Sequence, residues 1–374
     1  MTKNLAPGKF DVVGSFLRPE ILKKARRDFE DRKIKAEDLR QVEDKAIREL
    51  VEKEKNAGLK FYTDGEFRRS WWHFDFWWGF EGLEREIDKN DSFDFNGKKL
   101  RRENIRVKSK ISSKNHPFLE HFKFLKQFEE DDFTPKLTIP AIAVFLAQSI
   151  DSTVGIEDVY DSTREFIDDL VKAYVEFIDE FYKIGGRVLQ FDDVSWIGTV
   201  DENYRKKYEN SGKTIDELRQ EFLDYNNKIY ERAPKDLQIL THICRGNFMS
   251  HWLYQGAYDD VADYVFAKED IDGFFLEYDD ERSGDFKALA KIPEGKKVVL
   301  GIVTSKRAEL EDKNKLIERI KEAAKYIPLE NICISPQCGF ASTEEGNAVT
   351  EEDQWKKIAL LKEVAEEILI WINN

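Results

Sequence analysis

Eight short apolar runs alternate with longer segments of helical periodicity along this chain of 374 residues. Each run is bounded by polar or turn-forming residues, as buried strands are. The predicted strands are residues 10–14, 59–63, 136–139, 187–191, 237–242, 273–277, 297–303 and 331–335. Strands that alternate with helices pack into parallel sheets, and eight such units predict an α/β fold, a single (β/α)8 TIM barrel.

The segments between these strands carry apolar residues at helical spacing. In the longest segment Leu170, Tyr174 and Phe177 share one stripe, and the pair Gly185-Gly186 ends the helix. The predicted helices are residues 20–30, 36–57, 116–128, 156–184, 215–232, 259–267, 307–326 and 351–372. No low-complexity linker and no internal repeat divides the sequence, so we expect one domain over residues 1–374.

One segment does not fit the alternation of strands and helices. Residues 70–79 hold four of the chain's eight Trp residues, and Asn96-Gly97 is a hairpin-turn signal. We therefore expect an aromatic-rich insertion at about residues 70–115, after strand two. Its Trp71–Trp78 cluster could stack on a flat ligand such as a pterin, cover the barrel mouth or form a contact between two copies, and a homodimer is therefore one expectation.

Charge and cysteine content restrict the class of protein. The chain has 74 acidic and 60 basic residues and a formal charge of −14, which argues against nucleic acid or an anionic membrane surface as a partner. The N-terminus has no apolar signal core, and no apolar run is long enough to span a bilayer. The three cysteines, Cys244, Cys333 and Cys338, are few and odd in number, so we expect free thiols and a cytoplasmic location.

Metal-ligating side chains follow three of the predicted strands. His242 and Cys244 are spaced i, i+2 at the end of strand five, Glu277 ends strand six, and Cys338 follows strand eight. In a barrel the C-terminal strand ends meet at one mouth, and this set of nitrogen, sulfur and oxygen ligands suits Zn²⁺. We predict a zinc site held by all four. A packed core pair of His242 and Cys244, or a closed structural zinc site, are the alternatives.

Taken in series, six short motifs resemble the C-terminal catalytic barrel of the cobalamin-independent methionine synthase family. The resemblance covers nearly the whole chain, and it is closest to short relatives with one barrel, since the full-length enzymes have two. The four-ligand pattern is specific, whereas the other motifs carry weight only together. The motifs are Val13-Gly14-Ser15-Phe16, Asp64-Gly65-Glu66, Leu189-Gln190-Phe191-Asp192, Thr241-His242-Ile243-Cys244, Leu276-Glu277 and Ser335-Pro336-Gln337-Cys338-Gly339-Phe340.

The resemblance implies an enzyme like 5-methyltetrahydropteroyltriglutamate–homocysteine S-methyltransferase. It would use zinc to transfer a methyl group from a methyltetrahydrofolate-like donor to the thiol of homocysteine, forming methionine. By the same resemblance Glu66 and Asp192 hold the ammonium group of homocysteine, and Ser15 lies near its carboxylate. The residues alone leave alternatives open: Glu66 could pair with a nearby Arg, Asp192-Asp193 could cap the segment after them, and Ser15 could cap the helix after Pro19.

The chain departs from the family after strand seven. The full-length enzymes have a His there that is thought to protonate the departing folate, whereas this chain has Thr304, Ser305 and Lys306. Either Lys306, water or another residue supplies the proton, or the donor is not methyltetrahydrofolate. The competing hypotheses are a methylcobamide-dependent thiol methyltransferase and a non-catalytic barrel that binds an amino acid or a pterin. A zinc hydrolase is disfavoured by the two Cys ligands.

Overall fold

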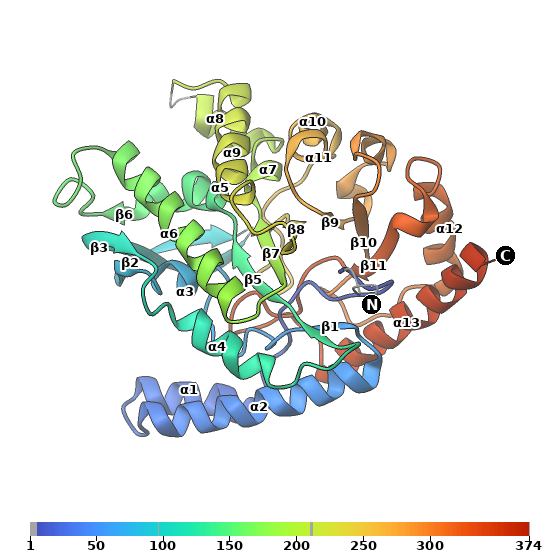
Figure 1. Cartoon of the computed structure of the whole chain (residues 1–374), viewed down its shortest axis with the longest axis horizontal. Helices are drawn as coiled ribbons and strands as arrows, with labels where there is room; N and C mark the ends of the chain where they lie inside the picture. The colour runs from blue at the N-terminus through green and yellow to red at the C-terminus, as the bar shows by residue number, and fades with distance from the viewer. Residues whose placement is uncertain (1–5, 96, 210–211, 374) are drawn as a thin grey trace.

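A parallel six-stranded sheet forms the centre of the protein in this computed structural model, which describes residues 6–95, 97–209 and 212–373 (Figure 1). Its strands are β5 (Leu137–Pro140), β7 (Val188–Asp193), β8 (Gln238–Ile243), β9 (Gly273–Glu277), β10 (Lys297–Val303) and β11 (Ile332–Pro336). They lie side by side in chain order, each parallel to the next. The predicted α/β alternation is confirmed, and all six C-terminal strand ends point to one side.

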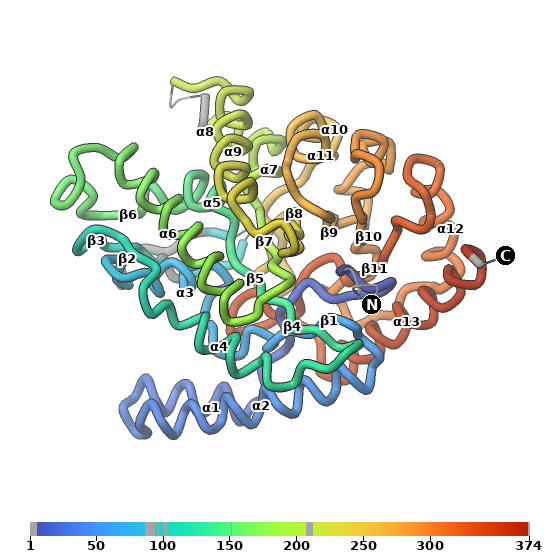
Figure 2. Tube along the Cα trace, viewed as in Figure 1, coloured from blue at the N-terminus to red at the C-terminus, as the bar shows by residue number. Residues whose placement is uncertain are grey.

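Two short segments extend this arrangement. β1 (Phe61–Tyr62) pairs in parallel with β4 (Thr134–Pro135), which leads directly into β5. On the other side Phe10 forms an isolated parallel bridge with Ile334 of β11, and Figure 2 shows the dark-blue N-terminal segment running beside that strand.

The prediction of a regular first strand over residues 10–14 was wrong. Side chains take the place of a strand ladder there: the ammonium group of Lys136 donates to the carbonyl of Val12 at 2.6 Å, and the hydroxyl of Thr63 donates to that of Gly14 at 2.6 Å. The predicted second strand is likewise reduced to the two residues of β1.

Several long helices follow their predicted bounds closely. α1 (Glu20–Glu30) and α2 (Ala36–Ala57) match them residue for residue, and they lie side by side at the lower edge of Figure 1. Gly58, with φ +88°, ends α2 in a left-handed turn, which glycine adopts without strain. α4 (Pro117–Lys126), α9 (Ile215–Tyr230) and α13 (Glu351–Asn373) differ from prediction by only a few residues.

Three predicted helices are shorter or divided. α6 (Thr163–Lys183) begins late because the Ser162 hydroxyl accepts a hydrogen bond from the Glu165 amide, and Asp312 caps α12 (Lys313–Ala323) in the same way. The segment 259–267 forms α10 (Asp259–Ala262) and α11 (Val265–Lys268). Short elements that the periodicity did not indicate are α5 (Ile142–Val144), the π-helix η1 (Phe145–Ser149), η2 (Ile150–Ser152), α7 (Ser195–Gly198), α8 (Glu202–Glu209), η3 (Glu281–Ser283), η4 (Lys287–Lys291) and η5 (Leu329–Asn331).

The aromatic-rich segment after β1 forms a small sheet beside the main one. It contains α3 (Phe74–Trp77) and the antiparallel strands β2 (Glu81–Phe95) and β3 (Lys98–Ser112), and β6 (Thr153–Val154) joins it in parallel. The strands meet at the predicted turn, of which Asn96 lies outside the described residues. Trp77 is buried and donates to the hydroxyl of Tyr174 in α6 at 2.7 Å, so the base of this segment belongs to the main hydrophobic core.

Within the described ranges, we find no helix whose length and apolar content would let it cross a membrane.

Candidate metal centre and substrate cavity

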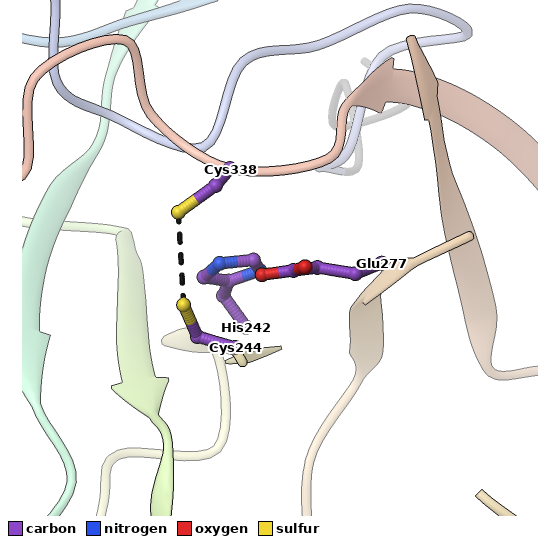
Figure 3. Close-up of side chains that lie close together, drawn as sticks. All are labelled: His242, Cys244, Glu277 and Cys338. Carbon is purple, nitrogen blue, oxygen red and sulfur yellow. Dashed lines mark hydrogen bonds between the residues drawn. The ribbon is translucent and has the colours of Figure 1, made fainter. Parts of the chain in front are cut away.

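Four side chains from separate parts of the chain converge at the C-terminal end of the sheet (Figure 3). His242 lies in β8, Cys244 follows that strand, Glu277 ends β9, and Cys338 follows β11. One ligand atom from each lies within 4.8 Å of the others, and all four residues are buried. The parallel register brings neighbouring strand ends to the same height, and the loops after β8 and β11 supply the two thiols.

The two cysteines interact directly, with their Sγ atoms 3.7 Å apart. The hydrogen bond with Cys338, together with burial, raises the pKa of Cys244, whereas the same hydrogen bond lowers the pKa of Cys338 well below its ordinary value. Burial opposes the charged form of His242, but the nearby Cys338 and the acidic groups around the ring raise its pKa overall. Negative charge therefore lies on the thiol of Cys338, where it would face a cation bound to the cluster.

The remaining polar atoms test whether a metal fits. His242 is tethered through Nδ1, 3.3 Å from the carbonyl of Phe275, and Glu277 accepts from the Arg245 amide through Oε1 at 3.0 Å. In the described part of the chain their other ligand atoms, His242 Nε2 and Glu277 Oε2, have no hydrogen-bond partner. Buried polar atoms without partners are costly, and coordination would satisfy both. The donor set therefore fits zinc.

Two other predicted residues lie outside the cluster. Cys333 is buried in β11 among apolar side chains, which agrees with its interpretation as a core residue. Lys306 is also buried, and among the described residues its Nζ has no hydrogen-bond partner. Burial raises the pKa of Glu277 overall, and the positive charge of Lys306 opposes that rise, so Lys306 acts on the cluster electrostatically.

The segment after β10 braces the loop that carries Cys338. The Ser305 hydroxyl donates to the carbonyl of Gly339 at 3.0 Å, and its amide donates to the Gln337 side chain at 2.5 Å. Thr304 is anchored by its amide to Glu311 at 2.8 Å. Thr304 and Ser305, in the segment that departs from the family pattern, thus help to hold the loop that carries Cys338.

A cavity of about 650 Å³ opens directly onto the cluster. His242, Cys244 and Cys338 form its floor, and the three residues predicted to bind substrate, Ser15, Glu66 and Asp192, also line it. The structure thus brings the predicted ligands and the predicted substrate residues to one place. The assignment of their roles stays a prediction.

Glu66 has an unusual backbone and a free carboxylate oxygen. Its φ is +59°, a left-handed conformation that residues other than glycine rarely adopt. Oε1 accepts from the Thr138 hydroxyl at 2.9 Å and lies 3.4 Å from Nη1 of Arg69, whereas Oε2 has no hydrogen-bond partner in the described ranges. Burial raises the pKa of this carboxyl. Glu66 therefore pairs with the nearby Arg69 and also lines the cavity, so the two interpretations of this residue are compatible.

The alternatives for Asp192 and Ser15 are decided by geometry. Asp193, and not Asp192, caps the following turn, because its carboxylate accepts from the Ser195 amide at 2.8 Å. Asp192 instead accepts from Gln190 at 2.7 Å, and burial raises its pKa to about 7. The helix after Pro19 has no side-chain cap, so the capping role for Ser15 was wrong. A Cβ at Gly339 would lie 1.9 Å from the Ser15 hydroxyl oxygen, so only glycine allows this approach.

Two further groups of side chains line the cavity. Trp71, Trp72, His73 and Phe74 form an aromatic wall, which contains two of the four clustered Trp residues. The other wall comes from η1, with Ala147, Gln148 and Ser149, and from Tyr204, Trp252 and Tyr254, while Phe95 and Leu100 of the β2–β3 hairpin also line the space. No motif in the sequence indicated this second wall, because its residues come from separate loops. Burial lowers the pKa of His73 to about 3, so its ring is neutral.

Comparison with known proteins places this geometry in context. The sequence model of a family described as "Cobalamin-independent synthase, Catalytic domain" matches residues 157–361. The uncharacterized protein YxjG of Bacillus subtilis is 42% identical over 363 residues, covering 97% of this chain and 95% of that protein. The crystal structure of a candidate vitamin-B12-independent methionine synthase from Listeria monocytogenes is 34% identical with a TM-score of 0.77, covering 98% of this chain and 99% of that one. A B12-independent methionine synthase from Shewanella, in complex with selenomethionine, shares the fold at 18% identity and a TM-score of 0.71, covering 96% and 97%.

Proposed function

The chain belongs to the cobalamin-independent methionine synthase family, in its single-domain form, and from this premise we propose that it methylates the thiol of homocysteine to form methionine. The observation that carries the proposal is the cluster of His242, Cys244, Glu277 and Cys338 opening onto a cavity that Glu66 and Asp192 also line. We further propose that the sheet closes into a (β/α)8 barrel through residues 9–13 and β1, as one domain with an insertion at about residues 70–115.

Zinc is the proposed cofactor, held by the four clustered side chains. When bound, it would take the substrate's sulfur and lower the pKa of the thiol, so that sulfur reacts as a thiolate at neutral pH. Cys244 and Cys338 must be reduced for this role, which supports a reducing compartment such as the cytoplasm. Burial of all four ligands keeps bulk water away from the nucleophile.

The amino-acid end of homocysteine is proposed to lie between the two acidic side chains. Glu66 offers Oε2, which is free of protein hydrogen bonds in the described ranges, and Asp192 holds its carboxylate at the cavity surface. An ammonium group between them would offset the electrostatic cost of burying two carboxylates close together. The Ser15 hydroxyl, next to them, is placed to donate to the carboxylate of the substrate.

The methyl donor is proposed to occupy the outer cavity, between the aromatic wall and η1. A methyltetrahydrofolate-like donor suits a flat space lined by Trp71 and Trp72. Its nitrogen leaving group needs a proton, however, and among the described residues Lys306 is buried and does not line the cavity, while the ring of His73 is neutral. A methylcobamide donor, whose departure needs no such acid, is therefore the second candidate.

Binding of homocysteine tests the acceptor. With zinc-loaded protein, Glu66→Gln and Asp192→Asn should each weaken binding measured by calorimetry, by roughly 1.5–3 kcal/mol for one charged contact. Asp201→Asn changes a carboxylate that lines the same cavity beside Tyr204, and it serves as the control. Equal affinity in wild type and both site variants would show that the proposed pose is wrong.

Single-turnover methyl transfer tests the donor. The zinc form with bound homocysteine is mixed with methyltetrahydrofolate in monoglutamate and polyglutamate forms and, separately, with methylcobalamin. We expect slow transfer from either folate, because a positioned acid contributes about 10²–10⁴-fold. Fast unaided transfer from folate would show that another group supplies the proton, and no transfer from any donor would favour a binding protein.

A further inference from the structure

Arg18 is a buried side chain that joins three loops of the site. It is 3% exposed, and in the part of the chain that the structure describes its guanidinium group donates to main-chain carbonyls alone. Nη2 donates to Glu66 at 2.7 Å and to Arg69 at 3.2 Å, while Nη1 donates to Ala341 and, at 3.4 Å, to Phe16. Acceptors as far apart in the sequence as Phe16, Glu66 and Ala341 thus share one cation.

Each of these loops carries a residue of the proposed site. The first holds Ser15, the second holds Glu66, and the third begins at Cys338. They also contact one another: the Phe340 amide donates to the Ser15 carbonyl at 2.9 Å, and the Phe16 amide donates to the Gly65 carbonyl at 3.1 Å. Arg18 lies where the three meet. A planar guanidinium with five donors can serve several carbonyls at once, which the single ammonium of lysine cannot reproduce.

The contact with Glu66 has a particular consequence. Glu66 is held at φ +59°, a left-handed conformation that is strained for a residue other than glycine. It persists only where surrounding contacts determine it. The bond from Arg18 to the carbonyl of Glu66 is one such contact. The same carbonyl accepts from the Arg69 amide at 3.0 Å, and the Glu66 amide donates to the Asp64 carboxylate at 2.9 Å. Removing the guanidinium takes away the charged donor among these contacts and should loosen the backbone of Glu66.

We propose that Arg18 is a positioning residue that fixes the left-handed backbone of Glu66 and so presents its carboxylate to the ammonium group of the substrate. This inference rests on the proposed function for the identity of the substrate. It assigns a role to a residue that does not line the cavity among the described residues and that acts through another side chain.

The test compares Arg18→Met and Arg18→Lys with wild type in the zinc-loaded protein. Homocysteine binding by calorimetry should weaken at least tenfold in Arg18→Met and less in Arg18→Lys, while the zinc content stays the same. Arg187→Met is the control, because Arg187 also donates to main-chain carbonyls, those of Tyr182 and Gly186, but at the opposite end of β7. If Arg18 acts through Glu66, then adding Arg18→Met to Glu66→Gln should weaken binding little further.

Hydrogen exchange separates this inference from the proposed function. Residues 64–69 should exchange faster in Arg18→Met than in wild type, whatever the substrate is. If wild type binds no homocysteine, the proposed function fails, but faster exchange over residues 64–69 in Arg18→Met would still support the role of Arg18. Unchanged exchange over residues 64–69 would overturn the inference about Arg18, whether or not homocysteine binds. Full additivity of the Arg18 and Glu66 substitutions would also overturn it. Should Arg18→Met fail to fold, the same comparisons are made with Arg18→Lys.

Discussion

The thiols of Cys244 and Cys338 lie 3.7 Å apart, although 94 positions separate them in the sequence. Each belongs to a loop that follows a strand, and each is set by main-chain contacts: the Gly246 amide donates to Sγ of Cys244 at 3.2 Å, and the Gln337 amide holds the preceding turn to Val303 at 2.8 Å. Both thiols are packed against the main hydrophobic core, and Ser is close to Cys in size, so replacing sulfur by oxygen should alter their chemistry without unfolding the protein.

This leads to a prediction at the scale of single residues. Cys244→Ser and Cys338→Ser should each lose most bound zinc, since a hydroxyl is a far weaker zinc ligand than a thiolate. Circular dichroism should remain that of wild type. Cys333→Ser is the matched control, because Cys333 is equally buried but lies outside the cluster, and it should retain zinc. The zinc content of each variant is measured by mass spectrometry. Full retention of zinc in both Cys244→Ser and Cys338→Ser would refute the assignment of these residues as ligands.

Several elements on one side of the sheet are joined by a buried network of polar side chains. Asn226 of α9 donates to Glu269, which follows α11, at 2.8 Å and to Asp193 of β7 at 3.2 Å. Trp196 of α7 donates to the same oxygen of Glu269 at 3.2 Å, while Oε2 of Glu269 has no hydrogen-bond partner among the residues described. Burial, together with the charge of Asp193, raises the pKa of Glu269 to about 8. At neutral pH this carboxyl is therefore mostly protonated.

The corresponding prediction concerns stability against pH. Because the pKa of Glu269 in the folded state lies above its ordinary value of 4.5, the folded state binds this proton more tightly than the unfolded chain. The resulting stability is complete below about pH 4.5 and is lost as the pH rises to about 8. The Gln side chain in Glu269→Gln has the shape of Glu but cannot titrate. Between about pH 5 and about pH 9 the free energy of unfolding of this variant should therefore fall less than that of wild type, and the difference should be a few kcal/mol.

Urea unfolding at the two pH values measures this difference. Glu294→Gln, on an exposed turn, is the control and should behave as wild type. If Glu269→Gln and wild type lose the same stability over this range, Glu269 is not protonated in the folded protein.

At the scale of the whole molecule, the four candidate ligands connect separate parts of the sheet. They come from β8, β9 and the loop after β11, so a bound metal would link both halves of the parallel sheet and the long C-terminal part of the chain. The unfolded chain has no preformed site, and metal binding therefore adds to the stability of the folded state.

We accordingly expect zinc to raise the unfolding temperature of the whole chain in one transition. At a zinc concentration 100 times its dissociation constant, the stabilisation is about 2.7 kcal/mol. Differential scanning calorimetry of chelator-treated protein, with and without added zinc, measures it. Cys333→Ser should respond as wild type does, and Cys338→Ser should not. An equal response in Cys338→Ser would place the stabilising metal elsewhere.

The sequence by itself determined the features that depend on local pattern and side-chain chemistry. Strand and helix periodicity predicted the six strands of the parallel sheet and the bounds of α1 and α2, because a period repeats within a few residues. The types of the four candidate ligands, and their positions after strands, followed from the same reading. What could not be predicted, such as the late start of α6 and the irregular segment at residues 10–14, depends on single hydrogen bonds. Ser162 accepts one of them and Lys136 donates the other, and no periodicity records either.

Only the tertiary structure decided how separate segments meet. The pairing register brings His242 beside Phe275 and Glu277 beside Gly301, and the loops then bring both thiols to the same point. The second wall of the cavity, the left-handed backbone of Glu66 and the carbonyls gathered around Arg18 arise from contacts between residues far apart in the sequence. Such contacts form only when the loops pack against the folded sheet. The free energy that stabilises them comes from many long-range contacts together, so no single segment of the sequence predicts them.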